Sequence, residues 1–465
     1  MPAGIASPEP CVRDNPSVSR RADCCVETTL EGRRARGGRG GGAGGRAAHM
    51  LRQPSADMRV LITDGNERAA LATARSLVRA GHTVCVTAAT PLSLAGVSHG
   101  VRARVITTDP LTNPAGYAAA VRRVAEQEGT TLLLPISDAA LEAVLERRAL
   151  LPAHIRVPFA DLATYRAASD KAHVLEQAQS CGFGVPETRI VASSEQWDEL
   201  IPDRFFPGVI KPHRSVVTAG TSRRKLVVTR VADACECRRV LAALPPEAFP
   251  VLVQRWVSGV GEGLFALRWG GRTIALFAHR RLREKPLAGG VSVYRESIAL
   301  DNRLVGPGLR LLDALGWQGV AMIECRHDLE TGDYVVMEVN GRFWGSLQLA
   351  IDAGVDFPAL LVRCALGERV PECRDYRIGI RSRWFWGDMD HFYLRFRDEP
   401  KWRAARDLFG SFLCRYRTEV WRWSDPLPFA VETLQWLGAL TPGTGDARSR
   451  SRAMPTESVP DSACR

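Results

Sequence analysis

Two apolar stretches interrupted by carboxylates decide the fold of this chain: Met322-Ile-Glu-Cys-Arg326 and Met337-Glu-Val-Asn-Gly-Arg342. Both have the period-two alternation of a half-buried strand. The residues Thr331-Gly-Asp333 between them are typical of a tight turn. The sequence therefore predicts a β-hairpin at this point of the chain.

This hairpin would gather oxygen ligands on one face. Because alternate residues of a strand share a face, we expect Glu338, Asn340 and Arg342 to point the same way, with Glu324 beside them. Carboxylate and amide oxygens suit Mg²⁺, and a guanidinium beside them suits a phosphate. A solvated polar strand face with one salt bridge is the alternative for such a pattern taken alone.

A second cluster places a lysine at the end of an apolar strand, in Phe206-Pro-Gly-Val-Ile-Lys211-Pro212. A lysine on a rigid element can present its ammonium to a phosphate as a point charge. The small-residue, basic loop 215–224 that follows is of a kind that folds over phosphates, or else a plain surface loop.

Two further segments frame this cluster. Ser169-Asp170-Lys171 opens a predicted helix, where the serine or aspartate can serve simply as a cap. The strand 251–257 runs into a Gly-rich turn that contains Glu262. Such a turn suits a nucleobase against the backbone and a carboxylate that accepts hydrogen bonds from a ribose.

The part of the chain before these clusters alternates strands and helices. We expect strands at 59–63, 83–87, 101–107 and 131–135, separated by helices, and hence a parallel sheet with both faces covered. This first domain, residues 58–160, is Rossmann-like in outline. Its first turn lacks G-x-G-x-x-G, so the sequence gives no case for a dinucleotide.

Beyond residue 161 the strands become longer and are separated by Gly-rich turns, which predicts an antiparallel α+β body. The expected strands are 208–211, 225–229, 251–254, 263–268, 273–280, 319–326 and 334–339.

Taken in order, these segments resemble the ATP-grasp superfamily, in particular its carbamoyl-phosphate-synthase-like and carboxylate–amine ligase members. The resemblance covers residues 58–372 and implies a pre-ATP-grasp domain followed by a two-lobed ATP-grasp domain, 161–372. It implies ATP and Mg²⁺ as cofactors, with Mn²⁺ as an alternative ion.

The resemblance also implies roles for individual residues. The implied nucleotide-binding residues are Lys171 and Lys211 at the phosphates, Gln254, Arg255, Trp256 and Val257 at an adenine hinge, and Glu262 at the ribose. The implied magnesium ligands are Glu324, Glu338 and Asn340, and Arg342 is implied to steady the transferring phosphate. The chain departs from the family at Arg255, where an acidic residue is common, and in its shorter, Arg-containing flap.

A basic loop lies between the ribose acid and the metal pair. Residues 278–296 hold five Lys and Arg around a Pro/Gly-Gly turn, and alternation would aim Arg281 and Arg295 inward at an anion. In close relatives this region faces the acyl acceptor or the carboxylate. Solvated strand ends are the alternative.

Residues 373–441 are rich in tryptophan and arginine: six of the eleven tryptophans lie between 376 and 441. Such a composition can serve nucleic acid or a membrane face, but more often it forms a helical cap on the neighbouring domain. We therefore expect neither nucleic acid nor a membrane as partner. Nucleic-acid binding would show a steep dependence on salt.

The composition is that of a globular protein of two or three domains, with 45% hydrophobic residues and a net charge of +11. We expect Gly/Arg-rich residues 1–57 and residues 442–465 to be disordered tails, with translation starting at Met50 or Met58 as an alternative. No stretch is apolar enough to cross a bilayer or to act as a signal peptide, which favours a cytoplasmic protein with reduced cysteines.

The sequence thus predicts an ATP- and Mg²⁺-dependent ligase that joins a small-molecule carboxylate to an amine or a thiol. A nucleotide-binding regulatory protein without turnover, and a bicarbonate-using carboxylase or carbamoyl-phosphate-like enzyme, are the alternatives. The identity of the substrates and the oligomeric state, a homo-oligomer included, are left open.

Overall fold

The computed structural model describes residues 58–196, 201–287 and 289–440. All of them belong to one compact unit, Ser55–Arg465. The two tails predicted at 1–57 and 442–465 lie outside the described residues. The divisions at 160 and 372 stay predictions. Across the described ranges, no helix combines the length and apolarity that spanning a bilayer requires.

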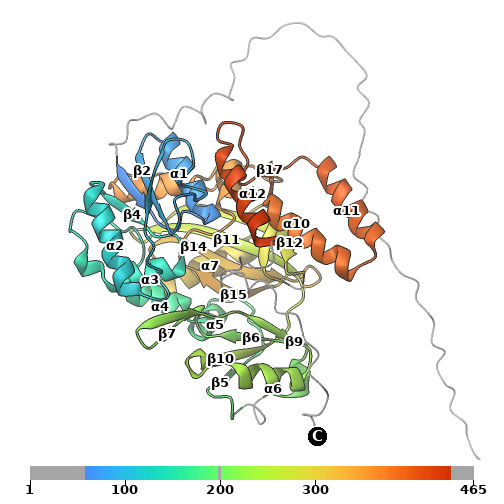
Figure 1. Cartoon of the computed structure of the whole chain (residues 1–465). Coiled ribbons are helices and arrows are strands. Elements are labelled where there is room, and N and C mark those ends of the chain that lie inside the picture. Colours follow the sequence, from blue (N-terminus) through green and yellow to red (C-terminus); the bar gives the residue numbers. More distant parts are fainter. Residues whose placement is uncertain (1–57, 197–200, 288, 441–465) are drawn as a thin grey trace, which may run out of the picture. The chain divides into compact units, whose positions relative to one another are not determined.

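The first sheet is parallel, with strand order β3-β2-β1-β4. Its strands are β1 (Arg59–Ile62), β2 (Thr83–Ala88), β3 (Val101–Val105) and β4 (Leu132–Leu134), and the helices that connect them include α1 (Arg68–Arg79) and α2 (Pro114–Gln127). β1 and β4 are fully or almost fully buried apolar runs, as expected for strands covered on both faces. Figure 1 shows these elements in blue and cyan. After β4, Ser137 caps α3 (Asp138–Glu146) by accepting a hydrogen bond from the Ala140 amide.

A small antiparallel sheet follows, with strand order β5-β10-β6-β9. It comprises β5 (Thr188–Val191), β6 (Gly208–Pro212), β9 (Thr229–Val231) and β10 (Val251–Arg255), and α6 (Ala234–Ala243) packs against it (Figure 1). Beside it lies a two-stranded hairpin, β7 (Val216–Ala219) and β8 (Ser222–Lys225). The predicted strand at 225–229 is therefore wrong, since β8 ends and β9 begins there; the Gly-containing turn before it makes the hairpin instead.

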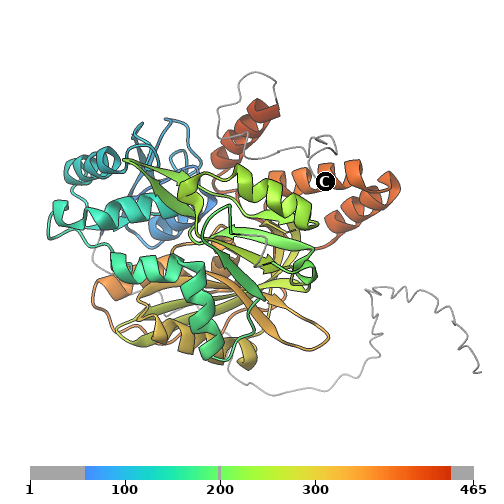
Figure 2. The ribbon, with the colours of Figure 1, turned by 90° about the horizontal axis from the view of Figure 1, so that it is seen from below.

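The largest sheet has seven strands in the order β15-β14-β11-β12-β13-β16-β17. Its first five strands are β11 (Val260–Trp269), β12 (Arg272–Lys285), β13 (Val291–Ser297), β14 (Gly319–His327) and β15 (Tyr334–Asn340), all paired antiparallel. Figure 2 shows the sheet from below. We call the face of this sheet that carries Gly263 and Glu324, which pair directly, the site face. The opposite face is covered by α7 (Asn302–Ala314), whose Gly308 lies against Leu264 and Ile323.

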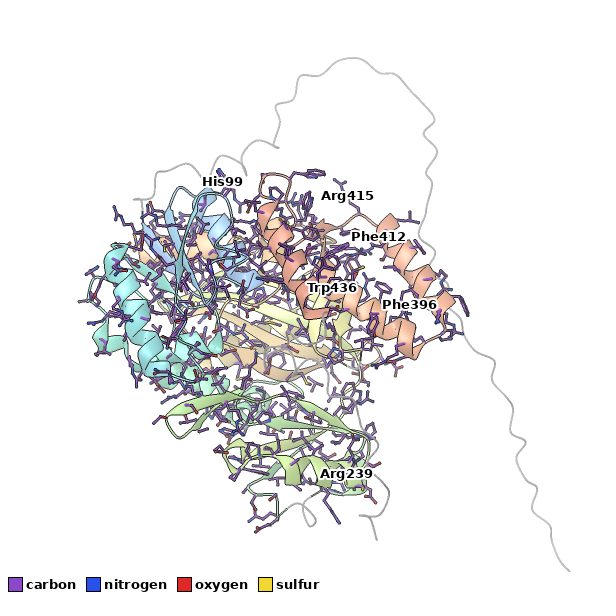
Figure 3. The ribbon with its side chains drawn as sticks, in the orientation of Figure 1. His99, Arg239, Phe396, Phe412, Arg415 and Trp436 are labelled. Atoms are coloured by element: carbon purple, nitrogen blue, oxygen red, sulfur yellow. The ribbon has the colours of Figure 1, made fainter. Side chains whose placement is uncertain are left out.

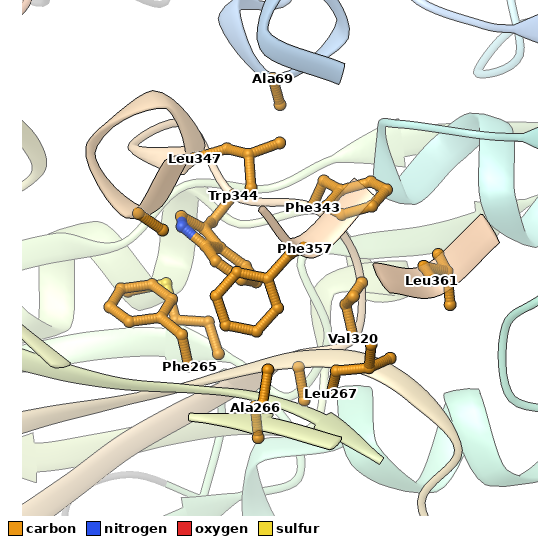
Figure 4. Packing of buried hydrophobic residues seen from close by; sticks show 14 of the residues in the cluster. Ala69, Phe265, Ala266, Leu267, Val320, Phe343, Trp344, Leu347, Phe357 and Leu361 are labelled. Atoms are coloured by element: carbon orange, nitrogen blue, oxygen red, sulfur yellow. The ribbon is translucent and has the colours of Figure 1, made fainter. Parts of the chain in front are cut away.

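An aromatic cluster fills one end of the site face (Figure 4). Phe265 packs against Trp344 with ring centroids 4.4 Å apart, and Trp344 meets Phe357 at 5.0 Å. All three rings are almost completely buried. Burying such rings removes large apolar areas from water, on the order of 2–3 kcal/mol each. The apolar end thereby fixes the strands whose polar residues form the site at the other end.

The sequence predicts a helical C-terminal region, but the structure shows that this region also contains two strands. It contains α10 (Phe385–Asp398), α11 (Lys401–Leu413) and α12 (Leu427–Leu440), but also β16 (Arg381–Arg383) and β17 (Arg417–Thr418). β16 pairs with β13 and thereby extends the large sheet. Tryptophans of this region bind α12 to α10. The indole of Trp436, which is labelled in Figure 3, donates to Asp390 at 2.9 Å, and the Trp386 indole donates to Thr433 at 3.0 Å.

The remaining helices connect these sheets: α4 (Leu162–Ser169), α5 (Lys171–Ser180), α8 (Leu347–Ala353) and α9 (Phe357–Ala365). Three short 3₁₀ turns lie at Arg148–Leu150, Asp203–Phe205 and Pro246–Ala248.

Candidate active site

Two carboxylates lie directly opposite each other at the polar end of the site face. The register of β14 and β15 pairs Glu324 with Glu338. Asn340, two residues further on the same strand, donates a hydrogen bond of 3.0 Å from Nδ2 to Oε1 of Glu338. Like charges opposite each other destabilise a pair of strands unless cations compensate them. The arrangement therefore calls for positive charge between the two strands.

Lys171 supplies part of that charge from the first residue of α5. Its Nζ lies 3.3 Å from Oε2 of Glu338 and donates to the Ser215 hydroxyl at 3.2 Å. Asp170 caps the helix by accepting a hydrogen bond from the His173 amide, which fixes the position of the Lys171 backbone. Burial works against the charge of Glu338, yet Lys171 holds the pKa of this carboxyl well below its usual range.

Lys211 approaches the same carboxylates from the small sheet. Burial lowers the pKa of Lys211 to about 8, against the attraction of Glu338 and Glu324. Among the described residues, its Nζ makes one weak hydrogen-bond contact, 3.7 Å from the Met337 sulfur. The ammonium is thus available for an anion placed between the two sheets.

Arg281 neutralises the second carboxylate. Its guanidinium pairs with Glu324 and, at 2.9 Å, with Glu284. Burial disfavours its charge, but the two carboxylates raise the pKa of Arg281 above its ordinary value. The inward direction predicted for this side chain agrees with its position.

Arg342 lies just beyond β15, and its Nε donates to Asp138 at 2.8 Å. Asp138 follows β4, at the carboxyl edge of the parallel sheet, where ligands of such sheets bind. Arg342 therefore links the large sheet to the first one and lies beside the carboxylate pair rather than between its members.

A solvent-open cleft of about 440 Å³ lies beside the carboxylate pair; Glu338 is in its lining, whereas Glu324, Lys211, Arg281 and Arg342 are not. Glu338, Asn340 and Lys171 line it together with Ser169 and Ser215, which belong to segments singled out in the sequence, and with four residues that the sequence did not indicate: Asp138, Glu142, Tyr165 and Arg214. Only Asp138 carried a usable signal, because it closely follows a predicted parallel strand.

The β7–β8 hairpin, predicted as a flap, is held over this region by ion pairs. Arg223 of β8 is buried and pairs with Glu146 of α3 at 2.6 Å. Arg214, before the hairpin, pairs with Glu142 one helical turn earlier at 2.7 Å. Two carboxylates of one helix thereby fix both ends of the covering segment.

The hinge residues follow the small sheet. Gln254 is buried and donates from Nε2 to Thr188 at 3.0 Å. The amides of Arg255 and Trp256 donate to the carbonyls of Glu187 and Pro207. The Val257 amide makes no hydrogen bond within the described residues, so its donor is free for a ligand.

Glu262 does not join the site. Strand alternation puts Gly263, not Glu262, opposite Glu324, so the Glu262 side chain points to the other face. There it is buried, accepts a hydrogen bond of 3.2 Å from the Tyr334 hydroxyl and lies 3.2 Å from His327. The expected ribose role has no geometric support.

Arg295 also departs from its expected role. It shares the face of Arg281, with which it pairs, but its guanidinium is buried in an ion pair with Glu419 and donates to the Ser292 carbonyl at 2.6 Å. A carboxylate 124 residues away in the sequence takes its charge. Arg295 is thus removed from the phosphate site.

The residues present fit a magnesium ion that is completed by its substrate. Within the described ranges, no three His, Cys, Asp or Glu residues converge as a ready-made metal cage. Two carboxylates and one amide do converge, and Mg²⁺ is usually held by one or two carboxylates together with phosphate oxygens and water.

Three solved structures show what the chain is similar to. An L-amino acid ligase from Bacillus licheniformis is 17% identical, with a TM-score of 0.52 over 67% of this chain and 74% of that one. N5-carboxyaminoimidazole synthetase from Staphylococcus aureus, complexed with ADP, is 12% identical, with a TM-score of 0.53 over 70% and 80%. The biotin carboxylase domain of the Hydrogenobacter thermophilus 2-oxoglutarate carboxylase, with MgADP and bicarbonate, is 14% identical, with a TM-score of 0.55 over 70% and 74%.

The chain has the ATP-grasp fold. Within it, residues 265–386 match a family model described as "ATP-grasp in the biosynthetic pathway with Ter operon". This match covers β12 to β16 with the carboxylate pair, roughly a quarter of the chain. A search of curated proteins found no match.

Proposed function

We propose that this protein is an ATP- and Mg²⁺-dependent ligase that activates a small carboxylate as an acyl phosphate and joins it to an amine. The observation that carries the proposal is the opposed pair Glu324 and Glu338 with three cations around it. Lys171 pairs with Glu338, Arg281 pairs with Glu324, and both carboxylates attract the Lys211 ammonium. A surface that merely binds protein would have no use for such a pair.

In this proposal the lysines and the carboxylates divide the work of holding the triphosphate. Lys211 and Lys171 neutralise phosphate oxygens from the small sheet and α5. Glu324, Glu338 and Asn340 hold magnesium, which when bound supplies charge compensation for the phosphates. The free Val257 amide and the Gln254 strand receive the adenine.

The chain's contribution to the chemistry is position and charge. An oxygen of the substrate carboxylate attacks the γ-phosphorus, the bond to the bridging oxygen breaks, and ADP leaves. Arg342 and Arg281 stabilise negative charge on the transferred group. The amine nitrogen then attacks the acyl carbon, phosphate leaves, and the amine gives up one proton. No covalent enzyme intermediate is required.

The covering hairpin supports a reaction that must exclude water. Arg223 and Arg214 hold the segment 214–225 against α3 above the cleft. A closed cover protects an acyl phosphate from hydrolysis.

The test is ADP and phosphate release by the full chain with MgATP and pooled carboxylic acids, bicarbonate included, each with and without pooled amines. We expect ADP formation that requires an organic acid and an amine. ADP formation with bicarbonate alone would favour the carboxylase alternative, and nucleotide binding without any turnover would favour the regulatory one.

Glu338→Gln is the informative variant, because it keeps the shape and removes the charge. Glu330→Gln, at an exposed turn of the same hairpin, is the matched control. Loss of acid-dependent ADP release in Glu338→Gln alone supports the proposal. Equal activity in both variants contradicts it. A cytoplasmic location, and the absence of nucleic acid and membrane partners, stay predictions.

A further inference from the structure

A second buried polar cluster lies outside the nucleotide site, at the junction of α1 with the C-terminal region. We call Arg68, Arg295, Trp384, Glu419 and Glu432 the C-terminal polar cluster. These residues come from α1, β13, the start of α10, the segment after β17 and α12. The proposed phosphate chemistry uses none of them.

One carboxylate of this cluster is fully compensated. Glu419 is buried and pairs with the guanidinium groups of both Arg68 and Arg295. The Ser382 hydroxyl adds a longer hydrogen bond of 3.4 Å to the same carboxylate. Two cations around one anion leave Glu419 no need for a further positive partner, and both guanidinium groups contact it.

The other carboxylate is only half satisfied. The Trp384 indole donates to Oε1 of Glu432 at 2.8 Å. Oε2 of Glu432 is buried and has no hydrogen-bond partner in the described part of the chain, although the residue is only 8% exposed. Leaving a buried acceptor unpaired costs about 1–3 kcal/mol, so the site lacks a donor.

The cluster adjoins the nucleotide site. Arg68 lies against Gly345, in the loop that carries Arg342, and its guanidinium lies 4.0 Å from the centre of the Trp384 ring. Gln435, one turn after Glu432, donates to Asn66 at 3.1 Å, in the turn that follows β1. α12 therefore lies beside the turn after β1, at the carboxyl edge of the parallel sheet, where Asp138 also meets Arg342.

The unpaired oxygen Oε2 of Glu432 indicates which kind of ligand the cluster would bind. A free carboxylate oxygen accepts from an N–H or an ammonium, whereas an anionic ligand would find both arginines already paired with Glu419. Burial raises the pKa of Glu432 to about 7, which a bound cation would reverse. Binding an amine would thus supply the hydrogen bond that Oε2 of Glu432 lacks.

We propose that Glu432, with Trp384 and Arg68 beside it, binds the amine substrate, which makes α12 part of the acceptor site. This inference rests on the proposed function, because only a ligase of that kind would use the bound amine as a substrate. It goes beyond that function by placing amine recognition on Glu432 of α12, which lies outside the matched residues 265–386.

The experiment measures binding, so that it does not depend on turnover. The full chain is melted with MgADP, and separately with ammonium, ethylamine and each of the twenty standard amino acids in the absence of nucleotide. The variants are Glu432→Gln and a matched control, Asp390→Asn, because Asp390 has both oxygens paired, with Trp436 and Lys285.

We expect at least one amine to raise the melting temperature of the wild type and of Asp390→Asn, and to bind Glu432→Gln at least 10-fold more weakly. MgADP should stabilise all three chains equally. An amine that binds Glu432→Gln as well as wild type, or no amine that binds wild type, overturns the inference. Failure of MgADP to stabilise any of the three chains contradicts the proposed function instead. The amine measurements contain no nucleotide, so they test the role of Glu432 independently.

Discussion

Lys171 and Glu338 form an ion pair of 3.3 Å that joins the start of α5 to the central carboxylate of the cleft. The lysine is almost fully buried, so each partner would leave an uncompensated charge if the other were removed. Under the proposed function, Lys171 would exchange Glu338 for a phosphate oxygen, and Glu338 would then be one of the residues that hold magnesium.

Lys171→Met should therefore lower stability by about 1–3 kcal/mol and weaken MgATP binding at least 10-fold. The double variant Lys171→Met/Glu338→Gln should recover part of the lost stability but none of the binding. Urea denaturation and calorimetry measure the two quantities. Equal stability of the single and double variants would show that the pair is not coupled.

Nucleotide binding should weaken in alkaline solution. The pKa of Lys211 is about 8 in the free protein, so the lysine loses its proton as the pH rises through that value, and phosphate binding must then draw a proton back. We expect the affinity for MgATP to fall between pH 8 and the ordinary lysine pKa of roughly 10.4, with proton uptake on binding. Lys211→Arg should flatten this dependence, since arginine keeps its charge.

The pH dependence of stability should reveal Glu432. Its folded pKa of about 7 lies above the usual glutamate value of about 4.3, so the folded state holds a proton that the unfolded state has lost. Stability should decline as the pH rises from about 4.3 to about 7. Chemical denaturation across this range should show a shallower decline in Glu432→Gln, and an identical slope would argue that Glu432 titrates normally.

The covering hairpin should open when its buried ion pair is broken. Arg223 is buried against Glu146, whereas its neighbour Arg224 is exposed. Arg223→Ala should therefore increase cleavage within 216–225 in limited proteolysis several-fold, and Arg224→Ala should not. Matching rates for the two variants would mean that the ion pair does not hold the hairpin.

Much of the geometry of the candidate site could be predicted because it depends on local patterns. Alternation within two strands and one turn was enough to bring Glu324, Glu338 and Asn340 to one face. The ribose role expected for Glu262 came from a predicted Gly-rich turn, but β11 already begins at Val260, and its register turns Glu262 away from Glu324.

Residues whose partners are distant in sequence could not be predicted. The sequence showed that Arg295 is basic and sits in a strand, but not that Glu419 would bury it. No sequence pattern marks Glu432 as a binding residue, because the evidence for that role is one unpaired oxygen in the packed structure. In the sequence, Glu142 and Glu146 are indistinguishable from the exposed face of an ordinary helix. Their ion pairs with Arg214 and Arg223 appear only in the folded structure.

The most direct test of the central claim is calorimetric binding of ATP to the full chain, with Mg²⁺ and with excess chelator, for wild type, Glu338→Gln and Lys211→Met. We predict binding to the wild type that depends on Mg²⁺, and a loss of at least 10-fold in each variant, with unchanged circular dichroism. ATP binding that ignores magnesium and survives both substitutions, or no binding to the wild type, would contradict an ATP site between the lysines and the carboxylate pair.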